Sequence, residues 1–281
     1  MTLDEIKKLL SGMATGMDDT IDNVNARAAE AQTRIFNMII KEIENFEISN
    51  GSYITGQDYT AKIAEIESKM YEIIAKVYNP AVYQYLKHYN AIETSTIQQH
   101  SDYNGIEVDK QKLNPIKQSL YNQSSYYLTE GLADAYVQPA KFVLMQYVTK
   151  GSPVKDLRSA IERWDKGTMN AGELASDRHA PRLQAYATQI ARDSMYTYAG
   201  TMQDVIRKEH GLTKFIYVGG LVKDSRPFCR HLVMLRRKID IDEVPPLVVA
   251  YPDGLKPDTT KKNFPLYRGG YACRHTVMFV K

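Results

Sequence analysis

The sequence predicts a mainly α-helical protein with a small C-terminal α+β module, in which long antiparallel helices are followed by short strands. Two observations lead to this fold class. Along most of residues 1–210, apolar side chains recur every three or four positions, which is the period of an amphipathic helix. After Gly211 the pattern changes to short apolar runs separated by turns rich in glycine and proline, which are typical of short strands.

The first two helices are predicted from single apolar stripes. One stripe covers residues 19–46 and indicates a long amphipathic helix. A second stripe follows the Asn50-Gly51 break and is interrupted at Asn79-Pro80, because proline has no backbone N–H and disfavours helical geometry in the residue before it. The segment after this proline could resume the helix with a kink.

Three further helices are predicted after a turn-rich connection at residues 101–114. Helical periodicity returns over residues 116–147. The next helix has Ser152 as a plausible N-cap and Pro153 at its first helical position, and it stops before a glycine. The clearest helix, with a broad apolar face, covers residues 181–211. Two β-like runs, KFIYVGGLV and HTVMFVK, follow it.

The C-terminal quarter is basic. Residues 211–281 hold 13 Lys and Arg against 6 Asp and Glu, a balance of +7, whereas residues 1–210 hold 23 against 27, a balance of −4. We therefore expect a helical body at residues 1–150, a helical segment at 151–210 and a small basic α+β module at 211–281. Such asymmetry can mark contact with phosphate groups, although a small solvated domain with surplus lysines is at least as common.

Composition disfavours several classes of protein. The N-terminal stretch carries charges throughout and shows no export signal, and no segment offers the roughly 20 consecutive apolar residues that span a bilayer. The 2 cysteines are too few for a disulfide framework. We expect a protein without a membrane partner that stays in the cytoplasm or is packaged there.

The two cysteines stand in two copies of Cys-Arg-His, which is the main chemical signal of the sequence. Cys229 and His231 form one C-x-H pair, and Cys273 and His275 form the other. In an extended strand, residues two apart point to the same side, so each pair could reach one ion. Two sulfur and two imidazole ligands suit tetrahedral zinc. All four residues are therefore candidate zinc ligands.

Other interpretations of these residues stay open. The cysteines are also explained as small buried apolar residues, and a disulfide between them is possible but disfavoured in a reducing cytoplasm. A nuclease could use nearby His and Arg side chains for acid–base work and phosphate stabilisation. No signature such as H-E-x-x-H or a P-loop ties them together, so we expect no enzymatic activity.

Four ordered segments carry a family resemblance: QIARDSMYTYAGTMQDVIRKEHG, KFIYVGGLVKDSRPFCRHL, DEVPPL and RGGYACRHTVMFV. Together they resemble the C-terminal core of phage head morphogenesis proteins, the Mu F-like minor head family. The resemblance covers residues 151–281, and residues 151–210 would form the helical part of that core. The motif positions in the two loops are Asp224, Arg226, Cys229, Gly270, Tyr271, Cys273, Arg274 and His275.

The resemblance implies a structural virion protein. It would be a minor capsid component inside the phage head, at or near the portal vertex, with the portal protein or the major capsid protein as partner. It would take part in head morphogenesis and could contact packaged double-stranded DNA. The alternative is a nuclease-like or non-specific DNA-binding protein acting through the basic module.

Two sets of side chains in the module have expected roles. Asp224 and Arg226 would hold the first loop, and Arg274 could pair with Asp224. Contacts to phosphate that lack sequence preference would come from exposed basic side chains. The candidates are Arg230, Arg236, Arg237, Lys238, Lys261 and Lys262.

Overall fold

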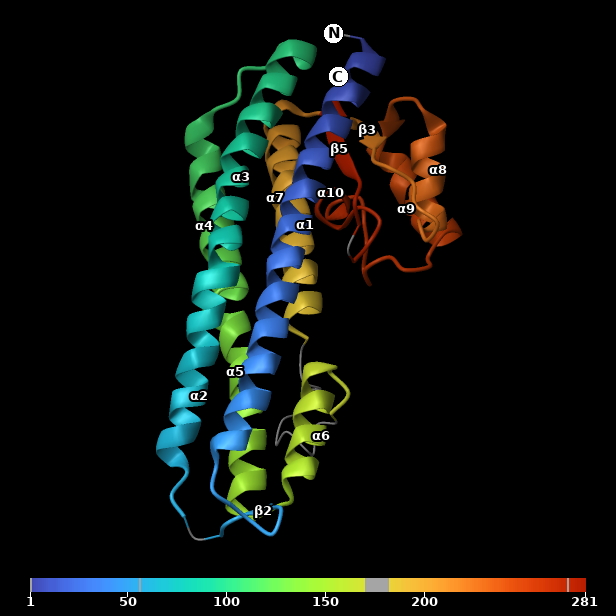
Figure 1. Cartoon of the computed structure of the whole chain (residues 1–281). Coiled ribbons are helices and arrows are strands. Elements are labelled where there is room, and N and C mark those ends of the chain that lie inside the picture. Colours follow the sequence, from blue (N-terminus) through green and yellow to red (C-terminus); the bar gives the residue numbers. More distant parts are fainter. Residues whose placement is uncertain (1, 56, 170–181, 272) are drawn as a thin grey trace. The chain divides into compact units, whose positions relative to one another are not determined.

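The computed structural model describes residues 2–55, 57–169, 182–271 and 273–281 (Figure 1). It confirms the predicted fold class, because long helices dominate the chain and a few short antiparallel strands lie near its C-terminus. The residues form two compact units. Unit 1 comprises Met1–Ile21, Tyr85–Ser124 and Gln189–Lys281, and unit 2 comprises Asp22–Gln84 and Ser125–Thr188.

The first helix is longer than its predicted stripe. Helix α1 covers Leu3–Glu42, and a short 3-10 turn, η1, follows at Ile43–Asn45. Ile6, Leu10 and Met17 extend the apolar stripe toward the N-terminus, and all three are fully buried. Helix α1 therefore begins well before residue 19, where the sequence placed its start.

A tight hairpin separates α1 from the next helix. Strands β1 (Ile48–Ser49) and β2 (Ser52–Tyr53) pair in antiparallel fashion. Both turn residues have positive φ, 50° at Asn50 and 77° at Gly51. This is the backbone that two-residue hairpins need, and Asn-Gly is the pair that adopts it at least cost.

Proline does not end the second helix. Helix α2 (Thr60–Ile73) continues through a π-helical segment, η2 (Ile74–Tyr78), into α3 (Asn79–Gln99). The Asn79 N–H donates to the Ile74 carbonyl, five residues back, so the turn just before Pro80 is widened. A wider turn accommodates a residue that has no N–H and whose ring would crowd a regular α-helical turn.

The remaining long helices follow closely on one another. After the π-helical segment η3 (His100–Asn104) come α4 (Lys110–Leu128), α5 (Glu130–Thr149), α6 (Val154–Asp165) and α7 (Leu183–His210). Helical backbone thus occupies both ends of the connection predicted at residues 101–114. The N-cap of α6 is Pro153 and not Ser152.

The two units do not follow the boundaries expected at residues 150 and 210. Helices α1, α3, α4 and α7 each contribute residues to both units, because a long helix is not limited to one packing neighbourhood. In unit 2, α5 and α6 pack through Tyr136 and Trp164, whose ring centroids lie 4.5 Å apart. The amide of Gln32 on α1 donates to the Asp165 carbonyl at 3.0 Å and ties α1 to the end of α6.

The C-terminal module belongs wholly to unit 1. Strand β5 and strand β4 flank the central strand β3, and all pairings are antiparallel. Figure 1 shows β3 and β5 in the orange and red part of the chain, near α8 and α9. The elements are β3 (Lys214–Val218), α8 (Pro227–Leu235), β4 (Ile239–Asp240), η5 (Ile241–Glu243), α9 (Val244–Ala250), α10 (Phe264–Tyr267) and β5 (Thr276–Val280).

Both faces of this small sheet are buried, and the alternation of side chains decides what each face contacts. On one face Ile216 and Val218 pack in a cluster with Ile6 and Leu10 of α1. On the other face Phe215 packs on Phe264 and Phe279, at ring-centroid distances of 5.0 and 5.8 Å. Tyr217 shares this second face, which is where the two cysteines meet.

Candidate metal site

The first Cys-Arg-His copy lies on a helix, not in an extended loop. Helix α8 begins at Pro227, which suits a first helical position, and Arg226 is its N-cap with extended backbone. A helix turns about 100° per residue, so side chains two apart point away from each other. Cys229 is buried, whereas the His231 ring lies against Tyr251, with Nδ1 3.3 Å from the phenol oxygen. The prediction that His231 joins the cysteines is therefore wrong.

The second copy is not helical: Cys273, Arg274 and His275 belong to no regular element. It follows α10 and leads directly into β5. Cys273 and His275 point to the same side, and the Cys273 Sγ lies 3.5 Å from the His275 Nδ1. Both side chains are buried. The other ring nitrogen of His275, Nε2, is also buried and has no hydrogen-bond partner among the described residues. Since buried polar atoms are usually partnered, this ring has unmet bonding capacity.

Three side chains from the two copies converge. The Cys229 and Cys273 sulfurs are 4.0 Å apart, and potential donor atoms of Cys229, Cys273 and His275 all lie within 4.8 Å of one another. Tetrahedral zinc, with Zn–S near 2.3 Å and Zn–N near 2.0 Å, places two sulfurs about 3.8 Å apart and sulfur and nitrogen about 3.5 Å apart. The cluster could therefore hold a metal ion with little rearrangement.

A tyrosine that the sequence did not single out completes the surroundings of the sulfurs. The Tyr217 hydroxyl on β3 lies 3.4 Å from the Cys229 sulfur and 3.6 Å from the Cys273 sulfur. Its ring stacks on His275, with centroids 5.2 Å apart. A phenol O–H can donate to a thiolate, and the stacked ring fixes the plane of the imidazole. The only sequence signal was the position of Tyr217 in an alternating β-like run.

Gly269 lets the chain pass close to the sulfurs. A Cβ at this position would lie 2.1 Å from the Cys229 sulfur and 3.1 Å from the Cys273 sulfur. The neighbouring Gly270 has φ of 93° and its missing Cβ would meet the Gly254 carbonyl oxygen. The Gly-Gly pair is therefore needed by the packing of the site and not only by the turn.

The two thiols are inequivalent. The hydrogen bond with Cys229, supported by His275 and by the positive charge of Arg268, lowers the pKa of the Cys273 thiol. The hydrogen bond with Cys273 and burial raise the pKa of the Cys229 thiol. Burial raises the pKa of Tyr217 as well. In the metal-free cluster Cys273 is thus the sulfur that ionises first, with Cys229 and Tyr217 as donors.

A cavity of about 80 Å³ opens beside the cluster, lined by its three side chains and by Asp224, Arg226 and Arg274. Arg226 donates from Nη2 to the Tyr271 carbonyl at 2.7 Å and links the two loops. Asp224 and Arg274 are exposed and share this cavity, but no ion pair joins these two described side chains. Six of the eight motif residues of the two loops thus line one site.

The basic side chains expected to contact phosphate are used in several ways. Arg230 donates to the carbonyls of Val222, Lys223 and Ser225 and so holds the first loop, which is the role the sequence predicts for Asp224 and Arg226. Lys261 pairs with Asp242 at 2.7 Å, and Lys238 donates to the Lys281 carbonyl at 3.0 Å. Exposed residues of this set include Arg236 and Lys262.

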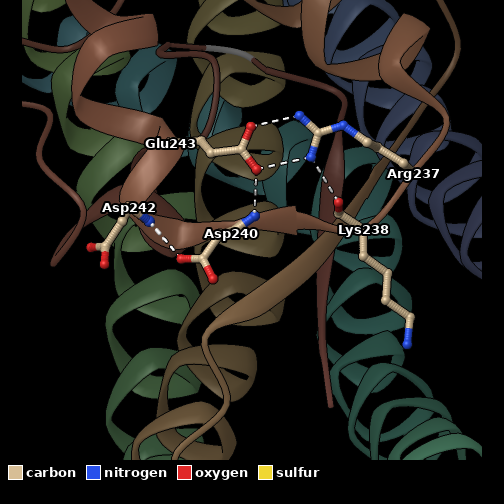
Figure 2. A network of polar contacts seen from close by, with 5 residues as sticks. All are labelled: Arg237, Lys238, Asp240, Asp242 and Glu243. Carbon is tan, nitrogen blue, oxygen red and sulfur yellow. Dashed lines mark hydrogen bonds and ion pairs between the residues drawn. The ribbon is translucent and has the colours of Figure 1, made fainter.

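Arg237 belongs to a network at the start of η5 (Figure 2). Its guanidinium donates to both carboxylate oxygens of Glu243, at 2.9 and 2.6 Å. This pairing lowers the pKa of Glu243 to about 2. The same carboxylate accepts from the Asp240 N–H, and the Asp240 carboxylate accepts from the Asp242 N–H, which forms a capping box. Arg237 therefore stabilises this turn, and its charge is largely neutralised there.

Comparison with known proteins gives no relative. No family model matches the chain, and no curated protein or solved structure matches it. Among the described residues, no helix combines the length and the apolar character needed to cross a membrane.

Proposed function

We propose that this chain is a structural component of a phage virion, a minor head protein that binds the portal or the adjacent capsid shell inside the head. One observation carries the proposal. Six of the eight loop motif positions that resemble the Mu F-like family line a single cavity although they come from separate segments: Asp224, Arg226, Cys229, Cys273, Arg274 and His275. A motif whose parts assemble into one site is better explained by a shared fold than by chance matches of short segments.

A structural role fits the residues of the site better than a catalytic one. Arg230 and Arg226 are occupied by backbone carbonyls, and His231 lies against Tyr251. A nuclease would need such side chains directed at a phosphate and at a leaving group. We infer that the motif mainly holds the module together.

We further propose that the cluster of Cys229, Cys273 and His275 holds a zinc ion. Two thiolates and an imidazole are the donor set that zinc takes in proteins, and the interatomic distances suit it. The ion would cross-link α8 to the segment before β5, and so stabilise the module. Elemental analysis of purified protein should find about one zinc per chain, and the Cys273→Ser variant should lose it.

A DNA contact is a second candidate, favoured by the charge balance of +7 in residues 211–281. Arg236 and Lys262 are its best candidates, because Arg237 and Lys261 already pair with carboxylates. The affinity for duplex DNA should fall steeply as the salt concentration rises. Replacing either residue by Gln should reduce the slope of log affinity against log salt concentration by about 1. A slope that stays the same in both variants would exclude this contact.

The virion assignment is tested by counting copies. Purified particles and isolated portal complexes are analysed by mass spectrometry for this chain. A small fixed number of copies that remains with the portal supports the proposal. Absence of the chain from particles would overturn the virion assignment and would make DNA binding the favoured function.

A further inference from the structure

The cluster offers three donor residues, and it faces an open space. Cys229, Cys273 and His275 are the described side chains whose donor atoms meet, since His231 is turned toward Tyr251. The same three residues line the cavity of about 80 Å³, which has room for a group of a few non-hydrogen atoms. Zinc with three protein ligands keeps its fourth position for an exchangeable ligand, whereas closed structural sites use four.

The walls of this cavity are charged in a way that selects the ligand. Arg226 and Arg274 contribute two positive charges, and Asp224 contributes one negative charge. A zinc ion with two thiolates is itself neutral, so the charged side chains decide the local potential. The surplus of positive charge on these side chains favours an anionic metal ligand over a neutral one.

We propose that the zinc centre binds an external carboxylate at its fourth position, through the cavity between the two loops. This inference rests on the zinc ion proposed above. The shared chemistry is one carboxylate oxygen on the metal, with Arg274 beside the second oxygen. The carboxylate can belong to a free small acid or to an Asp or Glu side chain of a docked protein.

The geometry around the cavity supports ligand exchange. Asp224 and Arg274 are exposed, so the outer end of the cavity reaches solvent, whereas the cysteines and His275 are buried. Arg226 is fixed by its hydrogen bond to the Tyr271 carbonyl and keeps its charge at the wall. A ligand can therefore enter without unfolding the module.

Cobalt substitution of the full chain tests the proposal. Thiolate-to-cobalt charge-transfer bands report that the metal is bound, and the visible ligand-field bands report its fourth ligand. We expect acetate to change the ligand-field bands in a saturable way. The Arg274→Gln variant should bind acetate about tenfold more weakly, and Asp224→Asn should bind it several-fold more tightly. Arg236→Gln, which removes an exposed charge outside this cavity, is the matched control.

The outcomes separate the two proposals. Bound cobalt with ligand-field bands that acetate leaves unchanged would overturn the carboxylate site while the metal site stands. Absence of charge-transfer bands would overturn the metal site itself. A second titration uses a short peptide with one Asp side chain and blocked ends. Saturation by acetate alone shows that the cavity admits only a free acid, and saturation by both probes shows that it also admits an Asp side chain of a peptide.

Discussion

The two Cys-Arg-His copies have the same three residues and different geometry. In the first copy the helical backbone of α8 sends Cys229 inward and turns His231 toward Tyr251. In the second copy the non-helical segment before β5 brings the Cys273 sulfur within 3.5 Å of the His275 Nδ1. The secondary structure around a short motif, and not the motif itself, therefore decides which of its side chains can share a ligand.

The central arginine differs between the copies as well. Arg230 donates to three loop carbonyls and is partly buried, whereas Arg274 is exposed at the wall of the cavity. The first copy thus supplies one sulfur and a brace for its own loop. The second supplies two donor atoms and a charge that faces solvent.

The largest expected effect separates the two histidines. His275→Gln should lower zinc affinity by on the order of 300-fold, because one of three ligands accounts for roughly a third of a binding free energy near 10 kcal/mol. His231→Gln should leave the affinity unchanged within about twofold. Competition with a chromophoric chelator measures both. Equal losses in the two variants would show that the copies act symmetrically and would contradict the geometry.

A histidine outside both copies shows how a buried neutral imidazole behaves without cysteines. His100 is fully buried and bonded to Gln203 and Asn104, and burial, with a smaller effect of the nearby His210, lowers its pKa from 6.5 to about 4. A lowered pKa means that its contribution to stability is complete above pH 6.5 and is lost as the pH falls toward 4. That contribution corresponds to roughly 3 kcal/mol at most.

Urea unfolding at pH 7 and at pH 4.5 measures this effect. The free energy of unfolding should fall with pH in the wild type and fall much less in His100→Gln, which cannot take up the proton. The same dependence in both proteins would mean that other groups control acid unfolding. Metal-free protein is used for both, so that metal release in acid does not contribute, and any proton uptake by Cys273 is common to the two proteins and cancels in the comparison.

The close packing of Gly269 against the cysteine sulfurs gives a smaller expected effect on stability. Gly269→Ala puts a methyl group where the Cys229 sulfur lies, so we expect a loss of about 2 kcal/mol in the free energy of unfolding. Gly220→Ala is the control, because a Cβ there meets nothing within 4 Å. Thermal and urea denaturation of both variants provide the measurement. A Gly269→Ala protein as stable as the control would show that the loop yields easily.

The smallest effect compares the two arginines. Arg230→Gln removes donors from the first loop and should cost about 1 kcal/mol. Arg274→Gln should change the free energy of unfolding by less than about 0.5 kcal/mol, as is usual for an exposed side chain. The reverse order in urea unfolding would mean that Arg274, and not Arg230, braces its loop.

Much of the fold could be predicted, because the spacing of apolar residues in an amphipathic helix can be recognised within a short stretch of sequence. The stripe in residues 181–211 and the change of pattern after Gly211 predicted the order of α7 and the strands correctly. The start of α1 was missed because glycines and charges dilute its stripe. Helix α8 was missed because a helix of nine residues is too short to show a clear repeat of apolar positions.

The site was predicted in part for a related reason. The repeat predicts Cys229, Cys273 and His275, but its two copies differ in structure, because the first is helical and only in the second do Cys and His meet. Tyr217 gave no signal of its own, because its role depends on the antiparallel register that places β3 beside β5. Contacts of this kind come from tertiary structure, which spacing along the chain does not encode.

X-ray absorption of the zinc-loaded chain tests the central claim most directly. We predict two sulfurs near 2.3 Å, light-atom ligands near 2.0 Å and the multiple scattering of a single imidazole. That imidazole signal should persist in His231→Gln and disappear in His275→Gln. Scattering from two imidazoles in the wild type, reduced by either substitution, would contradict the account and place His231 on the metal.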